Sequence, residues 1–243
     1  AVCPSPPDKV RGAEQYLISD EDEDRRIRGV DHVKQTLQNG VDVGAQAIIL
    51  HCGCIPVKEP IDIMKKLYDE GKIHSKEAEI ALQEISHTRT THKEKSFQSL
   101  LKSLNEINAE AEKLGINVGL ENRYYFYEFP DIEELKTIFN LFNGSRLGYW
   151  HDTGHAHVSE NLFGVSQETL LKTFHDQLIG VHLHDVLNGY NDHNEPGSGN
   201  VDFDTVKSYL KPKTIRVMEI NQRVNPSKVK EGIVFLKRNG IYN

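Results

Sequence analysis

Residues 149 to 157 read Tyr149-Trp150-His151-Asp152-Thr153-Gly154-His155-Ala156-His157. The apolar run from Leu147 to Trp150 leads directly into an acid and three histidines, and the hydrophobic pattern then stops. A buried parallel strand has this form when it delivers polar side chains to the carboxyl edge of its sheet. We therefore predict a strand over residues 146–152 with a functional site at its end.

Four other segments end in the same way, with an acid or a histidine after an apolar run. They are residues 47–53, ending at His51; 117–122, with Glu121; 179–185, with His182 and His184; and 214–220, with Glu219. A single acid or histidine after a strand is usually a hydrogen-bonded cap. Five strand ends carrying metal-type ligands instead favour one shared site.

The composition of the chain limits what it can do. At 243 residues and 27.6 kDa it is long enough for one large α/β domain. A net charge of −7 disfavours nucleic acid and anionic membranes as partners. Three cysteines imply no disulfide framework and fit a reducing cytoplasm. We find no apolar run of about 20 residues and no signal-peptide pattern, so we expect a cytoplasmic protein without a membrane partner.

Helical patterns alternate with the predicted strands, which is typical of a parallel α/β fold. A helix capped by Ser19 or Asp20 stops at Asn39-Gly40, and a short helix follows Pro60. The pattern Thr91-x-x-Glu94 is a capping-box signature for a helix that ends at Gly115. Further helices are predicted from about residue 131, from Ser166, from Asp202 and after Asn225-Pro226, and a strand is predicted within residues 1–7. We predict a single domain over residues 1–243, with a helical insertion at about residues 55–90.

The parity of the strands places four of the polar side chains together. If the faces that carry them point into a closed barrel, Glu121, Asp152, His182 and Glu219 converge near its carboxyl rim. Such a set of oxygen and nitrogen ligands suits one divalent ion, Mn²⁺, Zn²⁺, Co²⁺ or Mg²⁺. Cys52 and Cys54 have no second pair and form a weak zinc signal.

The motifs resemble the xylose isomerase-like TIM-barrel superfamily, which holds sugar isomerases and epimerases, inosose dehydratases and endonuclease IV-type apurinic-site nucleases (AP endonuclease family 2). The resemblance rests on Glu121-Asn122, on Asp152-Thr-Gly-His155, on His182-x-x-Asp185 and on the later Glu219. The segment of residues 193–203 also resembles a loop of the family. The resemblance implies a single-metal site at Glu121, Asp152, His182 and Glu219. It places His51, His155 and His193 where the nucleases hold additional metals and where many isomerases bind substrate.

The chain departs from this pattern in several places. Val2-Cys3-Pro4 and Asn191 stand where the nucleases have a histidine and an aspartate, and Asn188 stands where 3-epimerases have an arginine. We count six strands, against eight in a closed barrel, and the resemblance implies that the first two β/α units are absent. An open barrel exposes two sheet edges, which something must cover; a second copy of the chain, as a homodimer, is one candidate.

Our leading hypothesis is a metal-dependent isomerase or epimerase of a small sugar or sugar derivative, which works by proton transfer through a metal-bound enediolate. Glu121 and Glu219 would be the acid/base pair. His51, His155, His193, His184, Arg123 and Tyr125 would contact the carbohydrate. The alternatives are an apurinic-site phosphodiesterase, a non-catalytic ligand-binding barrel, and lyase or dehydratase chemistry on a polyol ketone.

Overall fold

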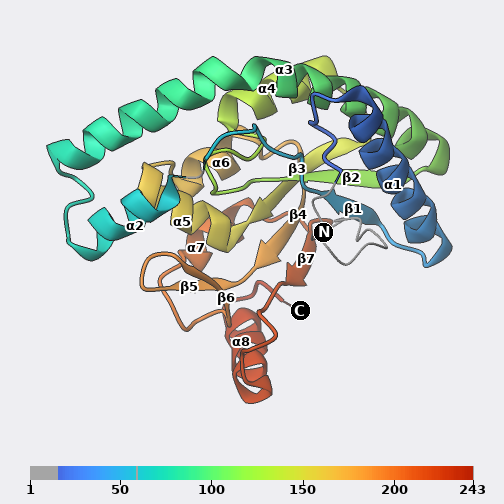
Figure 1. Ribbon diagram of the computed structural model, residues 1–243. Helices are drawn as coiled ribbons and strands as arrows, with labels where there is room; N and C mark the ends of the chain where they lie inside the picture. The colour runs from blue at the N-terminus through green and yellow to red at the C-terminus, as the bar shows by residue number, and fades with distance from the viewer. Residues whose placement is uncertain (1–15, 59, 243) are drawn as a thin grey trace. The chain divides into compact units, whose positions relative to one another are not determined.

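The computed structural model describes residues 16–58 and 60–242, which divide into two compact units (Figure 1). The first runs from residue 16 to 58 and adds residues 84–121 and 126–148. The second consists of residues 60–83, 122–125 and 149–242. The strand predicted within residues 1–7 lies outside the described residues, and the single domain over residues 1–243 stays a prediction.

The first unit is built around a parallel strand pair. Its elements are α1 (Glu23–Asp42), β1 (Ala47–Leu50), most of α3 (Lys76–Leu114), β2 (Asn117–Glu121) and α4 (Ile132–Leu141). β1 and β2 pair in register from Ala47 with Asn117 to Leu50 with Leu120. Helix α1 buries Val30, Val33 and Leu37 at the spacing of one helical face.

The start of α1 differs from the sequence prediction. Asp22 is its N-cap and accepts a hydrogen bond from the backbone N–H of Arg25. Asp20 instead accepts from the backbone N–H of Asp22, and the Ser19 hydroxyl accepts from the backbone N–H of Cys54. The helix also continues through Asn39-Gly40 to Asp42. The predicted boundaries were therefore wrong by a few residues at each end.

Helix α3 is continuous from Lys76 to Leu114, so the helix start predicted at Thr91 was wrong. The Thr91 hydroxyl donates to the carbonyl oxygen of His87, one turn earlier in the same helix. Inside a helix, a threonine hydroxyl can donate to the carbonyl oxygen four residues earlier. The Thr-x-x-Glu pattern therefore does not mark a helix start here. Within the predicted insertion, the short helix after Pro60 is confirmed as α2 (Ile61–Asp69).

Arg89 on α3 is buried. Its Nη2 lies 2.6 Å from Oε2 of Glu134, and its Nη1 donates to the carbonyl oxygens of Phe126 and Glu128. Burial raises the pKa of the Glu134 carboxyl in spite of the facing Arg89 guanidinium. The arginine therefore fastens α4 and the preceding loop to α3.

The second unit contains the remaining strands and five further helices among the described residues. Its elements are α2, the last four residues of β3 (Leu147–Asp152), α5 (Thr153–Phe163), α6 (Gln167–Thr173), β4 (Leu178–Leu183), β5 (Asp185–Leu187), β6 (Asn191–Asn194), α7 (Phe203–Tyr209), β7 (Ile215–Met218) and α8 (Pro226–Arg238). β3, β4 and β7 run parallel in that order, and β5 and β6 form an antiparallel pair.

Two elements of this unit are missing from the sequence prediction. Helix α5 begins directly after β3, with Asp152 as its N-cap, and ends at Gly164 with φ of 71°. The hairpin β5–β6 spans Asp185 to Asn194, where no hairpin was predicted, and its turn contains Asn188 and Gly189 with φ of 52° and 80°. Asparagine followed by glycine is a strong hairpin signal, since both tolerate positive φ. Among the described residues, no helix combines the length and the apolar character needed to cross a membrane.

Candidate functional site

Strand register in the second unit brings three predicted ligands together. Trp150 pairs with Gly180, Asp152 with His182, and His182 in turn with Val217. Because side chains alternate along a strand, Asp152 and His182 point to the same face, and Glu219 follows two residues after Val217. The carboxyl ends of β3, β4 and β7 therefore present an aspartate, a histidine and a glutamate side by side.

The three side chains are close enough to share one ion. His182 Nδ1 lies 3.5 Å from Oδ2 of Asp152 and 2.7 Å from Oε2 of Glu219. One ligand atom from each residue lies within 4.8 Å of those of the others. Asp152 and His182 are buried, whereas the Glu219 side chain is 37% exposed. Solvent or a substrate therefore reaches this set of residues from the Glu219 side.

The chemistry of this donor set fits a divalent cation. It offers two carboxylates and one imidazole and contains no thiolate, the combination that Mn²⁺, Co²⁺, Mg²⁺ and Zn²⁺ accept. Burial alone raises the pKa of the Asp152 carboxyl, but His155, His184 and His182 outweigh it and hold this pKa well below its usual range. Asp152 is thus held as the carboxylate, the form that binds metal.

Trp150 and Gly180 pack against each other, and the Trp150 ring contacts the ligand His182. A Cβ atom on Gly180 would lie 2.0 Å from Cζ3 of the Trp150 indole, so only glycine leaves room for this ring. The indole in turn packs edge-on against His182, with the ring centroids 5.3 Å apart. The two residues therefore restrict the orientation of the His182 imidazole.

Asn122 holds the backbone at the end of β3. Its Oδ1 accepts from the backbone N–H of Asp152 at 2.8 Å and from the Tyr149 hydroxyl at 3.1 Å, and its Nδ2 donates to the Asp152 carbonyl at 3.1 Å. All three residues are buried, so no water competes for these bonds. Asn122 belongs to the predicted Glu121-Asn122 motif, but this structural role was not predicted.

His155 and the hairpin residues Asp192 and His193 form a second polar group in this unit. His155 Nδ1 lies 3.1 Å from the carbonyl oxygen of Asn122, and its Nε2 lies 4.0 Å from Oδ2 of Asp192. His193 adopts φ of 59°, and its Nδ1 lies 3.1 Å from Oδ1 of Asp192. Burial lowers the pKa of His193, but the facing Asp192 carboxylate outweighs this, so the net shift is upward. Asp192 was not predicted, because its neighbour Asn191 was read as the equivalent position.

Aromatic rings lie beside His155. Tyr124 packs on Tyr125, with centroids 4.4 Å apart, and on His155, with centroids 5.2 Å apart. Burial raises the pKa of the Tyr124 hydroxyl, so this side chain stays protonated at neutral pH. Arg123 Nη1 lies 3.5 Å from Nε2 of His155. The predicted substrate contacts Arg123, Tyr125 and His155 therefore lie in one neighbourhood, together with His193.

Two further predicted site residues belong to the first unit. Glu121 is the last residue of β2, and His51 follows β1, which ends at Leu50. His51 Nε2 lies 2.9 Å from Oε2 of Glu121, and the Glu121 side chain is only 1% exposed. The pair confirms that these two strand ends meet; the part of Glu121 in metal binding and catalysis stays a prediction.

Sequence comparison places the chain among proteins of related sequence. A model of the xylose isomerase-like TIM barrel family matches residues 10–239. An uncharacterized protein of Methanocaldococcus jannaschii is 26% identical over 205 residues, which are 82% of this chain and 64% of that protein. A second uncharacterized protein of the same organism is 37% identical over 112 residues, or 45% of this chain and 37% of that protein. The chain thus spans less than two thirds of the length of these relatives.

Solved structures with similar folds include named epimerases. A D-tagatose 3-epimerase-like protein superposes with a TM-score of 0.63 at 20% identity, over 93% of this chain and 73% of that one. D-allulose 3-epimerase from Methylomonas sp. gives 0.65 at 14% identity, over 93% and 74%. The IOLI protein with a binding zinc atom gives 0.58 at 16% identity, over 93% and 72%. At these identities the likeness is one of fold.

These comparisons confirm the predicted α/β barrel class. The family match extends over both compact units and over every element that carries a candidate ligand. The chain belongs to the xylose isomerase-like TIM barrel family.

Proposed function

We propose that this chain is a divalent-metal-dependent isomerase or epimerase that acts on a small sugar or sugar derivative. The observation that carries the proposal is the set of Asp152, His182 and Glu219, whose ligand atoms lie within 4.8 Å of one another at three neighbouring strand ends. Family membership supports the same class, and so do the structural neighbours, which include a D-tagatose 3-epimerase-like protein and a D-allulose 3-epimerase.

Asp152, His182 and Glu219 would hold the ion, and Glu121 is the fourth ligand expected from the family resemblance. When bound, a divalent ion acts as a Lewis acid that polarises a substrate carbonyl and acidifies the neighbouring C–H bond. Asp152 and His182 would act as ligands only, because both side chains are buried and a substrate carbon could not approach them closely enough for proton transfer.

Glu219 is the acid/base residue that the geometry favours. Its side chain is 37% exposed, and its Oε2 lies 2.7 Å from Nδ1 of His182, so one carboxylate oxygen can face a substrate while the other faces the proposed metal site. The carboxylate would take the proton from the carbon beside the carbonyl and return it to the neighbouring carbon in an isomerase. An epimerase returns the proton to the opposite face of the same carbon, and Glu121 is the predicted second residue for that step.

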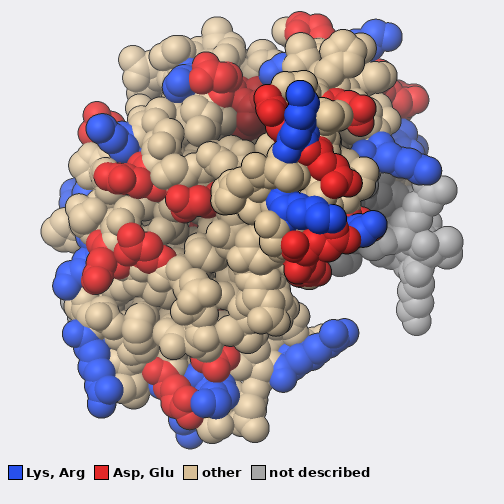
Figure 2. Space-filling model, turned by 90° about the vertical axis from the view of Figure 1, so that its left-hand side faces the viewer, with Lys and Arg blue, Asp and Glu red and all other residues tan. Residues whose placement is uncertain are grey.

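The substrate contacts are also proposals. Arg123, His155 and His193 offer hydrogen bonds to sugar hydroxyls, and the packed rings of Tyr124 and Tyr125 offer an apolar wall. His51 is the corresponding candidate in the first unit. On the face seen in Figure 2, basic side chains lie among acidic ones. The net charge of −7 supports a small neutral substrate over a polyanion such as DNA.

Metal content per chain tests the proposal directly. Elemental analysis of protein purified without chelator should give one divalent ion per chain in the wild type and none in Asp152→Ala. Asp152 also caps α5, so the matched control is Asp202→Ala, which removes the N-cap of α7 and should leave the metal in place.

The metal-loaded enzyme is then screened against ketoses and aldoses, with Glu219→Gln as the test of the acid/base role. The glutamine variant should lose turnover by at least about 100-fold, the usual scale for removing a general acid/base. A chain that takes up no metal on reconstitution would sink the proposal and leave a ligand-binding barrel. Two or three zinc ions, together with nicking of abasic duplex DNA, would move the function to the nuclease class.

A further inference from the structure

His184 is buried, and both nitrogens of its ring are engaged. Its Nδ1 lies 2.8 Å from the backbone nitrogen of His193. A backbone N–H can only donate, so Nδ1 must be the acceptor and carries no proton. The proton of the neutral imidazole is therefore on Nε2.

The Nε2–H group of His184 faces the carboxylate of Asp152. Its nitrogen lies 2.8 Å from Oδ1 and 2.9 Å from Oδ2, so the donor sits between the two oxygens. Oδ1 also accepts from the backbone N–H of His155 at 2.7 Å. An ionised carboxylate only accepts hydrogen bonds, and both groups that face it here, the His184 Nε2–H and the His155 N–H, are donors. No additional proton is needed. The orientation of the Asp152 carboxylate is thus set from two sides.

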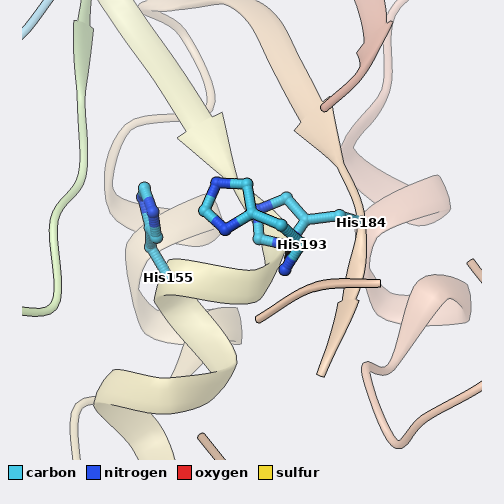
Figure 3. Close-up of side chains that lie close together, drawn as sticks. All are labelled: His155, His184 and His193. Atoms are coloured by element: carbon cyan, nitrogen blue, oxygen red, sulfur yellow. Dashed lines mark hydrogen bonds between the residues drawn. The ribbon is translucent and has the colours of Figure 1, made fainter. Parts of the chain in front are cut away.

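Three neighbouring histidines, His155, His184 and His193, lie close enough together to suggest a second metal site. One ring nitrogen each of His155, His184 and His193 lies within 4.8 Å of the others, which by distance alone resembles a second metal site. The rings of His184 and His193 are stacked, with centroids 4.2 Å apart and planes 11° apart, while His155 lies on α5 (Figure 3). With both of its nitrogens committed, His184 has no lone pair to offer an ion in this arrangement.

The Asp-Thr-Gly-His segment makes room for this histidine and fixes its backbone. The Thr153 hydroxyl donates to the carbonyl of His184 at 2.8 Å and accepts from its N–H at 3.1 Å. A Cβ atom on Gly154 would lie 2.0 Å from Cε1 of the His184 ring, so the imidazole occupies the space that only glycine leaves. Each residue from Asp152 to His155 therefore contacts His184 or shares its acceptor.

We propose that His184 is a positioning residue: it holds the Asp152 carboxylate in its ligating orientation and ties it to the β5–β6 hairpin through the backbone of His193. The part of this inference that concerns metal affinity rests on the proposed function; the part that concerns the ring's tautomer and its bond to Asp152 does not. The hairpin that carries Asp192 and His193 is thereby fixed relative to a metal ligand. The substrate contact expected of His184 from the sequence stays a prediction.

The first arm of the test reads the tautomer in metal-free protein. Histidine labelled with ¹⁵N gives separate resonances for protonated and unprotonated ring nitrogens, and the signal lost in His184→Gln assigns the residue. We expect the proton on Nε2 and none on Nδ1. A proton on Nδ1, or a ring that averages between tautomers, would overturn the proposal whatever the metal data show.

The second arm reads metal affinity by calorimetric titration with Mn²⁺ and Co²⁺. His184→Ala should weaken binding by about 10–100-fold, the range for residues that orient a ligand. His184→Gln should recover most of the loss, because its amide can still donate to Asp152. His175→Ala is the control, since His175 is exposed and lies outside the site, and it should bind as the wild type does.

The outcomes separate the two proposals. Wild-type affinity in His184→Ala, or a glutamine variant as weak as alanine, would overturn the positioning role. A wild type that binds no metal would overturn the proposed function alone, and the tautomer measurement would still decide the geometry. If His184→Ala does not fold, the ¹⁵N spectrum of the wild type and the metal affinity of His184→Gln still test the proposal.

Discussion

Asp152 combines a structural and a chemical task in one side chain. Its Oδ1 caps α5 through the backbone N–H of His155, and both of its oxygens lie within hydrogen-bonding distance of His184. A helix N-terminus stabilises negative charge, and this favours the ionised form that a metal needs. The task expected from the sequence, metal binding, stays a proposal, whereas the cap is visible in the structure.

For single residues, the sequence predicted the face of the sheet on which a side chain lies better than it predicted its hydrogen-bond partners. Strand parity predicted that Asp152 and His182 share a face if both strands turn those faces into a barrel, and the register pairs the two residues directly. Asn188-Gly189 was a usable signal for the turn of the hairpin that carries Asp192, and the prediction did not use it. The partners of the His184 ring depend on how separate segments pack, which local patterns do not encode.

Replacing Gly154 by alanine should destabilise the protein. In an ordinary helix this change stabilises by about 1 kcal/mol, since alanine is the better helix former. Here the added methyl group would overlap the His184 ring, and overpacking of this kind costs about 1–3 kcal/mol. Urea unfolding gives the sign: a more stable Gly154→Ala variant would mean that the ring does not occupy this space.

His151 should make the protein less stable in mild acid. Burial is the main cause that lowers the pKa of His151 to about 4, below the value of about 6.5 in an unfolded chain. Between these values the unfolded chain binds a proton that the folded one does not. The stabilisation is therefore complete above about pH 6.5 and is lost as the pH falls toward about 4.

The comparison of wild type with His151→Gln isolates this residue from the other histidines. Between about pH 7.5 and about pH 5, the wild type should lose about 2 kcal/mol more of its unfolding free energy than the variant does. The measurement is urea unfolding at several pH values. Parallel curves for the two proteins would contradict the assignment.

Among the elements, α3 shows where a local motif misleads. Thr91-x-x-Glu94 has the residues of a capping box, yet Thr91 is exposed in the middle of a 39-residue helix. Buried positions before and after it continue one helical face at spacings of four and seven residues, with Ile85 and Arg89 ahead of Ser96 and Leu100. Packing of that face overrides the local signal, since tertiary contacts supply most of a helix's stability.

Thr91→Ala distinguishes the two interpretations by its sign. Inside a helix, alanine should raise the unfolding free energy by about 0.5 kcal/mol through its higher helix propensity. At an N-cap the same change would lower it by about 1 kcal/mol. Thermal and urea unfolding of the variant beside the wild type measure the difference, and a loss of stability would restore the predicted boundary.

At the scale of the whole molecule, metal binding should stabilise the native state. An ion that binds only the folded chain adds about 2.7 kcal/mol at a free concentration of about 100 times its Kd. For a chain of this size, that corresponds to a rise in Tm of about 5–10 °C. A thermal scan with and without Mn²⁺ should show the rise in wild type and Asp202→Ala and none in Asp152→Ala. An equal rise in all three would place the ion elsewhere.

The class of fold was accessible from the alternation of strands and helices, and the family match confirms it. The order of strand ends was also accessible, because β/α alternation forces parallel strands whose carboxyl ends share one edge. The predicted homodimer stays a prediction: sedimentation equilibrium should give twice the chain mass of 27.6 kDa if a second copy covers the open edges.

Trp150 gives the protein an optical reporter at its own candidate site. It is the only tryptophan of the chain, and its ring centroid lies 5.3 Å from that of His182. Intrinsic emission excited in the indole band therefore reads this location alone. A coloured ion such as Co²⁺ beside His182 would quench the emission by energy transfer, whereas colourless Mg²⁺ would leave its intensity nearly unchanged. Occupancy can thus be followed by fluorescence in the unlabelled, unmodified chain.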